Sequence, residues 1–270
     1  MPHFGPVKLF LKRTSIFPIA SIVKPALRAR FVTLSAAAGI IGPILFAIIV
    51  IALGYLWTGY DPLTQTISEL GATNAPYMGI QALNFAILGI LTIIFVIGLA
   101  IHNGLFRSTA IVVGMYGLGT LLVAFLPCDP GCSFRGSSVV QVAHGLDALI
   151  SFIGLAIAPL LFWRSSRTAS SWTKTSVWSL RVAIGSIPLL CAYLAITILA
   201  SLPYTGLLQR IFFGLLFAWM IVIALRLFSL RGIRFPGSSG EDAHTTTVGS
   251  VHPSSSDNLG RSETSPKEPA

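Results

Sequence analysis

The fourth apolar stretch of this sequence carries polar residues at helical spacing. Ser137, Gln141, His144, Asp147 and Ser151 follow one another at steps of four, three, three and four residues. Residues three and four positions apart share one face of an α-helix, so these side chains form a single polar stripe. An imidazole and a carboxylate one turn apart can relay protons, act as acid and base, or bind a polar ligand. The pattern therefore predicts a functional site, provided that the stripe faces the interior of a helical bundle.

The composition indicates that the medium around this stripe is lipid. Of the 270 residues, 54% are hydrophobic and only 10% are charged, whereas soluble domains have about 25% charged residues. A helix that spans a membrane needs roughly 20 mainly apolar residues. Six windows meet this length, at about 34–57, 79–101, 108–127, 139–162, 177–202 and 208–229. Because backbone groups in hydrocarbon must be paired within their own segment, we predict an all-α integral membrane bundle of six transmembrane helices.

The basic residues predict how this bundle is oriented. The net charge is +9, and Lys and Arg gather before the first window, between the fourth and fifth, and after the last. The connection at 58–78 has no Lys or Arg. Since Lys and Arg are retained on the cytoplasmic side during insertion, we expect both termini to be cytoplasmic, N-in and C-in, in the cell membrane. The positive charge therefore reports topology, and no nucleic-acid partner is expected.

Three regions are expected along the chain. Residues 1–33 form a basic cytoplasmic arm resting on anionic membrane lipids, with a cleaved signal peptide as the alternative. Residues 34–230 form the transmembrane domain. Residues 231–270 contain almost no large apolar side chains, which predicts a disordered cytoplasmic tail.

The connection YDPLTQTISELG (60–71) has residue types that begin and end helices, and its apolar residues recur at helical spacing. We predict a short amphipathic helix at the outer interface, capping the site. Asp61 is either its N-cap or a site residue. Ser68 and Glu69 fall away from the apolar stripe, and Glu69 lies either on a solvated face or in the site.

The third connection contains PCDPGC (127–132), a turn sequence with Pro and Gly at its centre. This turn can bring Cys128 and Cys132 together, as a disulfide or as two free thiols. Their spacing is not that of a zinc finger, so no metal ion and no other cofactor are expected.

The acidic residues within 34–230 all fall on the outer side or in the outer half of the bilayer under this topology. Arg210 lies on the same side, where it either extends to the interface or balances an outer carboxylate. We therefore expect an outward-opening polar pocket between the helices. Its candidate residues are Asp61, Ser68, Glu69, Asn84, Asp129, Gln141, His144, Asp147 and Arg210.

Four segments in this order resemble a bacterial and archaeal membrane family known as domain of unknown function 998. They are GYDPLTQTISELG, PCDPGC, AHGLDAL and LLQR, and the resemblance covers about residues 34–230. It implies a six-span protein without an established activity. The polar positions that match the family pattern are Asp61, Ser68, Glu69, Asp129, His144 and Arg210.

Three functions fit these observations. The first is a sensor or transporter of a small molecule or lipid, because ionisable groups inside a membrane mark binding sites and paths. The second is a membrane-embedded enzyme acting on a lipid head group, although the chain has no HExxH or GxSxG motif. The third is a structural or partner-binding protein, in which His144 and Asp147 lock the helices together.

Overall fold

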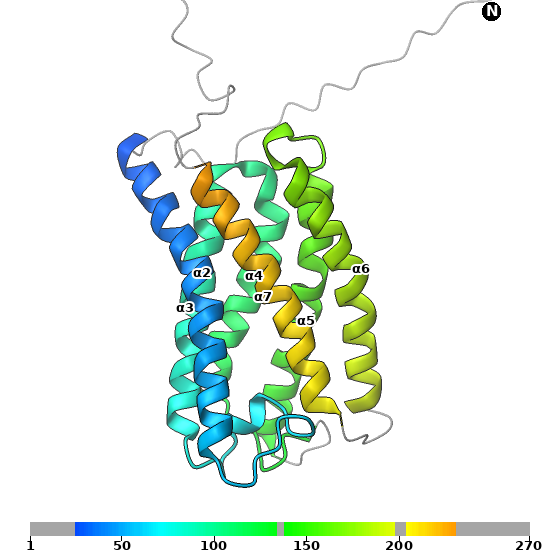
Figure 1. Ribbon diagram of the computed structural model, residues 1–270. Coiled ribbons are helices and arrows are strands. Elements are labelled where there is room, and N and C mark those ends of the chain that lie inside the picture. The colour runs from blue at the N-terminus through cyan, green and yellow to red at the C-terminus, as the bar shows by residue number, and fades with distance from the viewer. Residues whose placement is uncertain (1–24, 134–137, 198–203, 231–270) are drawn as a thin grey trace, which may run out of the picture. The chain divides into compact units, whose positions relative to one another are not determined.

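Six long helices dominate the computed structural model, which describes residues 25–133, 138–197 and 204–230 (Figure 1). All six are long and apolar enough to cross a membrane, α4 together with the short turn before it. The predicted all-α architecture with six apolar spans is therefore confirmed. The helices are α2 (Pro25–Leu56), α3 (Met78–His102), α4 (Arg107–Val123), α5 (Val139–Ser166), α6 (Thr173–Ala195) and α7 (Thr205–Ser229).

The six helices form a closed ring. Each packs against its neighbours in chain order, and α2 also packs against α7, which completes the circle. Residues 57–77 and 124–133, the last residues of α6 and the first residues of α7 lie at one end, at the bottom of Figure 1, which we call the long-loop end. The turns at 103–106 and 167–172 lie at the opposite end, which we call the short-turn end.

Small residues allow neighbouring helices to approach closely. A Cβ atom on Gly89 of α3 would lie 2.6 Å from the carbonyl oxygen of Gly117 on α4, so the two backbones are in direct contact there. Close approach of this kind is the usual basis of helix association in lipid, where apolar burial gives little drive between helices.

The half of the ring near the short-turn end is filled by aromatic side chains. Phe106, Phe162, Trp172 and Trp219 are fully buried, and the ring centroids of Phe106 and Phe162 are 4.8 Å apart. The indole Nε1 of Trp219 donates a hydrogen bond to Ser179 Oγ at 2.9 Å. This half is a packed core among the described residues.

The first helix begins earlier than the hydrophobic window. Residues 25–33 belong to α2, and Arg28 donates to the carbonyl oxygen of Ile101 at 2.6 Å, near the end of α3. A cation at that position binds carbonyl groups left unpaired at a helix C-terminus. Residues 1–24 and 231–270, which include most of the expected arm and tail, lie outside the described residues.

The connection after α2 contains a turn and a 3₁₀ helix where a short amphipathic helix was expected. Gln65 N donates to Asp61 O at 2.8 Å, which closes one helical turn. The chain then re-forms as η1 (Ser68–Gly71), a 3₁₀ helix whose Leu70 is buried. The η1 part of this connection is therefore buried at the long-loop end of the ring.

Candidate functional site

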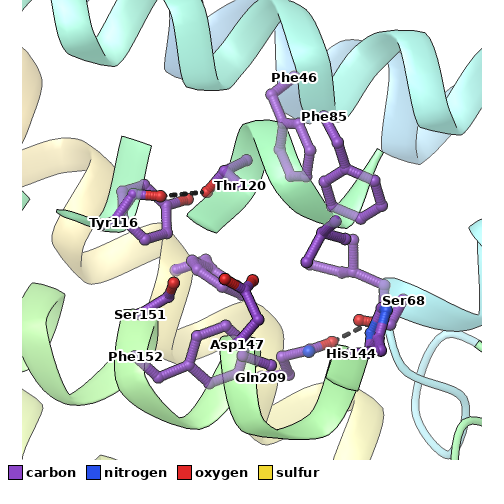
Figure 2. A pocket seen from close by; sticks show the side chains of 14 residues that line it. Phe46, Ser68, Phe85, Tyr116, Thr120, His144, Asp147, Ser151, Phe152 and Gln209 are labelled. Carbon is purple, nitrogen blue, oxygen red and sulfur yellow. Dashed lines mark hydrogen bonds between the residues drawn. The ribbon is translucent and has the colours of Figure 1, made fainter. Parts of the chain in front are cut away.

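A small cavity lies inside the ring near the long-loop end (Figure 2). Its volume is about 30 Å³, which is enough for one or two water molecules. Five aromatic rings line it, each from a different helix: Phe46, Phe85, Tyr116, Phe152 and Phe213. The cavity is therefore a largely aromatic box assembled by α2, α3, α4, α5 and α7.

The polar stripe of α5 supplies the ionisable groups of this box. His144, Asp147 and Ser151 all line it, as their spacing predicted for an interior-facing stripe. Gln141, 2% exposed, lines a neighbouring cavity of about 60 Å³. Ser137 lies outside the described residues. The end of α5 nearer the long loops thus presents its polar face to the interior of the ring.

His144 lies where three cavities meet. With Ser68 of η1 it lines the aromatic box and two adjoining cavities of about 60 Å³ each. Its side chain is 5% exposed, and Nδ1 lies 2.7 Å from the carbonyl oxygen of Leu126. A carbonyl can only accept, so Nδ1 carries the proton and Nε2 keeps a free lone pair.

Asp147 fits against α4 because residue 119 is a glycine. A Cβ atom there would lie 2.8 Å from Asp147 Oδ1 and still closer to Ser151 Oγ. In Figure 2 the carboxylate points into the cavity. Its Oδ2 atom is buried without a hydrogen-bond partner among the described residues. A buried acceptor without a partner is unfavourable by about 1–3 kcal/mol, so this oxygen is available to a ligand.

Residues 60–67, which we call the anchored segment, are fastened to the start of α7. Arg210 donates to the carbonyl oxygens of Pro62 and Gln65 at 2.7 and 2.8 Å and to the Tyr60 hydroxyl. Its positive charge is therefore used on carbonyl and phenol oxygens. The two roles expected for Arg210, extension to the interface and balance of an outer carboxylate, stay predictions.

Tyr60 bridges the segment and Arg210. Burial raises the pKa of its hydroxyl, although the neighbouring Arg210 guanidinium acts in the opposite direction. The hydroxyl is therefore protonated at neutral pH, and it donates to the Thr66 carbonyl oxygen at 2.7 Å while accepting from Arg210.

Three further hydrogen bonds join the anchored segment to the first turns of α7. Two of them are donated by α7: Thr205 Oγ1 donates to Thr64 O at 2.8 Å, and Leu207 N donates to Leu63 O at 2.9 Å. The third is donated by the segment, from Ile67 N to Gln209 Oε1 at 2.6 Å. Ile67 and Gln209 also line the aromatic box. The segment therefore forms part of the cavity wall.

The carboxylates of Asp61 and Asp129 accept hydrogen bonds from residues close to them in the sequence and do not line the aromatic box. Asp61 is exposed and accepts from Leu63 N and Thr64 Oγ1 at 3.0 and 2.8 Å, and these hydrogen bonds lower the pKa of its carboxyl. Asp129 accepts from Ser138 Oγ at 2.8 Å at the start of α5. Both carboxylates thus stabilise turns.

Glu69 is buried, with 8% of its surface exposed, and so does not lie on a solvated face. Its Oε1 accepts from Thr66 N at 2.8 Å and its Oε2 from Gln65 Nε2 at 3.1 Å. Asn84 is also buried, and its Nδ2 donates to Phe46 O at 3.3 Å. Neither residue lines the three cavities.

Cys128 and Cys132 are joined by a disulfide, with their Cα atoms 5.2 Å apart. The bridge lies beside η1, since Cys128 Sγ is 3.5 Å from the carbonyl oxygen of Ser68. Thr73 N also donates to Cys128 O at 3.0 Å. The loop that carries the bridge is thereby tied to the end of the first connection.

The cavity contains residues that the polar pattern does not single out. Its aromatic rings have the same sequence signature as ordinary core residues. Gln209 is next to Arg210 at the start of an apolar span. This position was the only feature of the sequence that could have indicated its place in the cavity wall. Thr120 also lines the cavity, but its hydroxyl donates to the Tyr116 carbonyl oxygen at 2.8 Å within its own helix.

Comparison with known proteins identifies a family without an assigned activity. No curated protein and no solved structure matches the chain. A family model described as "Protein of unknown function (DUF998)" matches residues 40–226, which include the aromatic box, the anchored segment and the disulfide. Since this match covers well over half of the chain, the protein is a multi-pass membrane protein that belongs to the DUF998 family.

Proposed function

We propose that this protein is a membrane sensor or carrier that binds, from the outer side, a small molecule or lipid head group through a primary ammonium group. The observation that carries the proposal is the Asp147 carboxylate, which enters a box of five aromatic rings with one oxygen left unpartnered among the described residues.

The chemistry of the box favours a cation. Aromatic faces carry partial negative charge and attract ammonium groups, with a gain of about 2 kcal/mol or more where water is excluded. A carboxylate in the same space supplies the counter-charge that a buried cation requires. Anionic or purely apolar ligands would leave the Asp147 carboxylate without compensation.

The size of the box distinguishes primary from quaternary ammonium groups. A volume of about 30 Å³ accepts a group close to water in size, and –NH₃⁺ is such a group. A trimethylammonium group is several times larger and would require the aromatic rings to separate. The three donors of a primary ammonium can also bind Asp147 Oδ2 and nearby oxygens such as Ser151 Oγ.

The charge distribution supports access from the outside. At the long-loop end, the described charged residues are the acids Asp61, Glu69 and Asp129 and one cation, Arg210, in the first turns of α7. Around the short-turn end the described charged residues are all cations, among them Arg28 of α2, Arg167 after α5 and Lys174 of α6. Retention of cations in the cytoplasm would place the short-turn end, and with it both termini, inside. The connection with η1 then lies at the outer interface, above the cavity.

The packed half of the ring favours a sensor or carrier over an open channel. Beyond the cavity the interior contains buried Phe106, Phe162 and Trp219, so bulky side chains stand in the way of a bound cation in this conformation. An enzyme would require His144 to activate a nucleophile or water. In the described part of the chain, the hydrogen bond of His144 goes instead to Leu126.

Binding can be tested with the full-length protein in lipid nanodiscs. We expect ethanolamine to bind and to raise the thermal unfolding temperature, and choline to have much less effect. Mass spectrometry of the detergent-extracted protein should find a primary amine or an amino lipid. Equal binding of choline would contradict the size argument.

The carboxylate can be tested by substitution. Loss of a hydrogen bond to a charged group costs about 1.5–3 kcal/mol, so Asp147→Asn should weaken ethanolamine binding by roughly 10- to 100-fold. Asp61→Asn is the matched control, because Asn also caps turns well and this residue lies outside the cavity. Unchanged binding by Asp147→Asn would refute the proposed site.

A further inference from the structure

Three side chains that the amine proposal does not use as ligands lie close together next to the cavities. Cys128 Sγ, Cys132 Sγ and a ring nitrogen of His144 all lie within 4.8 Å of one another. We propose that, when the disulfide is reduced, these three residues bind one Cu(I) ion. This inference does not rest on the proposed function, because its argument uses neither Asp147 nor the aromatic rings, although His144 also lines the aromatic box.

The three side chains are close enough to converge on one metal ion once the disulfide is reduced. A metal ion about 2.2 Å from each of three ligands holds the ligand atoms roughly 4 Å apart. The separations within this cluster are at most 4.8 Å, and after reduction the two sulfur atoms, which are bonded to each other here, would have to move apart by side-chain rotation. The sulfur atoms come from one tight turn, in which Cys132 N donates to Asp129 O at 2.9 Å.

The imidazole is already prepared as a ligand. Metal-binding histidines almost always donate their second ring N–H to a carbonyl or carboxylate, which fixes the tautomer and the ring orientation. His144 Nδ1 lies 2.7 Å from Leu126 O and donates to it, which leaves Nε2 with its lone pair. A histidine used only to pack the helices would need no such free lone pair.

The donor set favours Cu(I) over zinc. Two soft thiolates and one imidazole suit Cu(I), whereas structural zinc usually takes four protein ligands. The carboxylate of Asp129, which follows Cys128 in the sequence, accepts a hydrogen bond from Ser138 Oγ. The undescribed residues at 134–137 and 198–203 include no His, Cys, Asp or Glu. Among the described residues the ligand set is therefore three-coordinate.

The disulfide makes copper binding depend on redox state. An external dithiol transfers two electrons and two protons to the S–S bond, which gives two thiols and an oxidised dithiol. Cu(I) then replaces the two thiol protons, which leave to water. In the oxidised form the two sulfur atoms are bonded to each other, so neither is available as a thiolate.

The experiment uses full-length protein carrying Cys191→Ser, which removes the remaining free cysteine, located on α6. Protein reduced with dithiothreitol and desalted without oxygen is titrated with Cu(I) against the chromophoric competitor bicinchoninate. We expect about one equivalent of copper in the reduced protein and none in the oxidised protein, which serves as the folded control.

Substitutions at the ligands give a sharper test. Cys128→Ser with Cys132→Ser should abolish binding. His144→Leu should weaken it about tenfold or more, by analogy with losses around other metal sites. His144→Met, of similar size but with a soft sulfur ligand, should largely retain it. These outcomes, with two sulfur neighbours and one nitrogen neighbour in the X-ray absorption spectrum of the unsubstituted site, would support the proposal.

Other outcomes would overturn it. These are copper binding that survives loss of both cysteines, equal affinities of the His144→Leu and His144→Met variants, or a preference for zinc in direct competition. Asp147→Asn should bind copper normally while losing ethanolamine. Failure of the copper site is therefore distinguishable from failure of the amine site.

Discussion

At the scale of single residues, the site depends on a glycine at position 119, because a side chain there would collide with the site. The carboxylate of Asp147 and the hydroxyl of Ser151 occupy the space in which a Cβ atom of residue 119 would lie. Gly119 is therefore required by the facing helix, and not by its own backbone conformation. An acid in the cavity and a glycine opposite it act as one structural unit.

We predict that Gly119→Ala destabilises the protein and distorts the cavity. Forcing a methyl group into a filled interior usually costs about 1–3 kcal/mol, and here it would displace Asp147 and Ser151. Thermal unfolding in nanodiscs should show a lower midpoint, together with weaker ethanolamine binding. Gly214→Ala is the control, since a Cβ there meets nothing within 4 Å; equal effects of the two changes would contradict this account.

The sequence predicted part of the site because helical spacing fixes which residues share a face. His144, Asp147 and Ser151 line the cavity for that reason. The loop residues Asp61 and Glu69 could not be placed in the same way. Their positions are set by hydrogen bonds to nearby amides and hydroxyls, and such local partners leave no periodic pattern in the sequence.

At the scale of elements, the anchored segment is neither a free loop nor a regular helix. The amide of Ile67 donates to the side chain of Gln209 on α7, so it cannot continue a helical ladder begun at Asp61. After this break the hydrogen bonds run from Leu70 to Ile67 in the 3₁₀ pattern. The predicted helix is therefore interrupted by a local contact, from Thr66 N to the Glu69 carboxylate, and by a tertiary contact, from Ile67 N to Gln209, and sequence spacing cannot reveal the second.

We predict that Arg210→Gln releases the anchored segment. The guanidinium holds Tyr60, Pro62 and Gln65, and a single hydrogen bond from a charged group contributes about 1.5–3 kcal/mol. Amide hydrogen exchange in residues 60–67 should accelerate by about tenfold or more.

Arg226→Gln provides the comparison for that experiment. Arg226 also donates to a backbone carbonyl, that of Ser171, but at the short-turn end. It should leave exchange in residues 60–67 unchanged. Acceleration by both variants would indicate general loosening of the helix ring instead of local release.

At the scale of the whole protein, the number of spans and their approximate limits were predictable, because an uninterrupted apolar window of about twenty residues is typical of a membrane-spanning helix. The order of packing around the ring was not predicted, since apolar faces toward lipid and toward other helices have similar compositions. The prediction was least accurate at the ends of the helices. Residues 25–33 continue α2 despite their charges, because Arg28 binds carbonyl groups at the end of α3.

The orientation can be measured with single cysteines introduced into protein that carries Cys191→Ser. Thr58 is exposed after α2 and Thr168 is exposed after α5, at opposite ends of the ring. If both termini are cytoplasmic, a membrane-impermeant maleimide applied to intact cells should label Thr58→Cys and spare Thr168→Cys until the cells are opened. The reverse pattern would place the cavity on the cytoplasmic side.

The bond between Ile67 and Gln209 joins positions 142 residues apart, and this separation has a consequence for biosynthesis. A nascent chain that has inserted only five spans has no surface on which to seat residues 60–67. The aromatic box around Asp147 is therefore completed only after the final span has left the ribosome. A premature stop before Thr205 would remove α7 and with it the hydrogen bonds that hold residues 60–67. The Asp147 carboxylate would then be exposed to water or lipid.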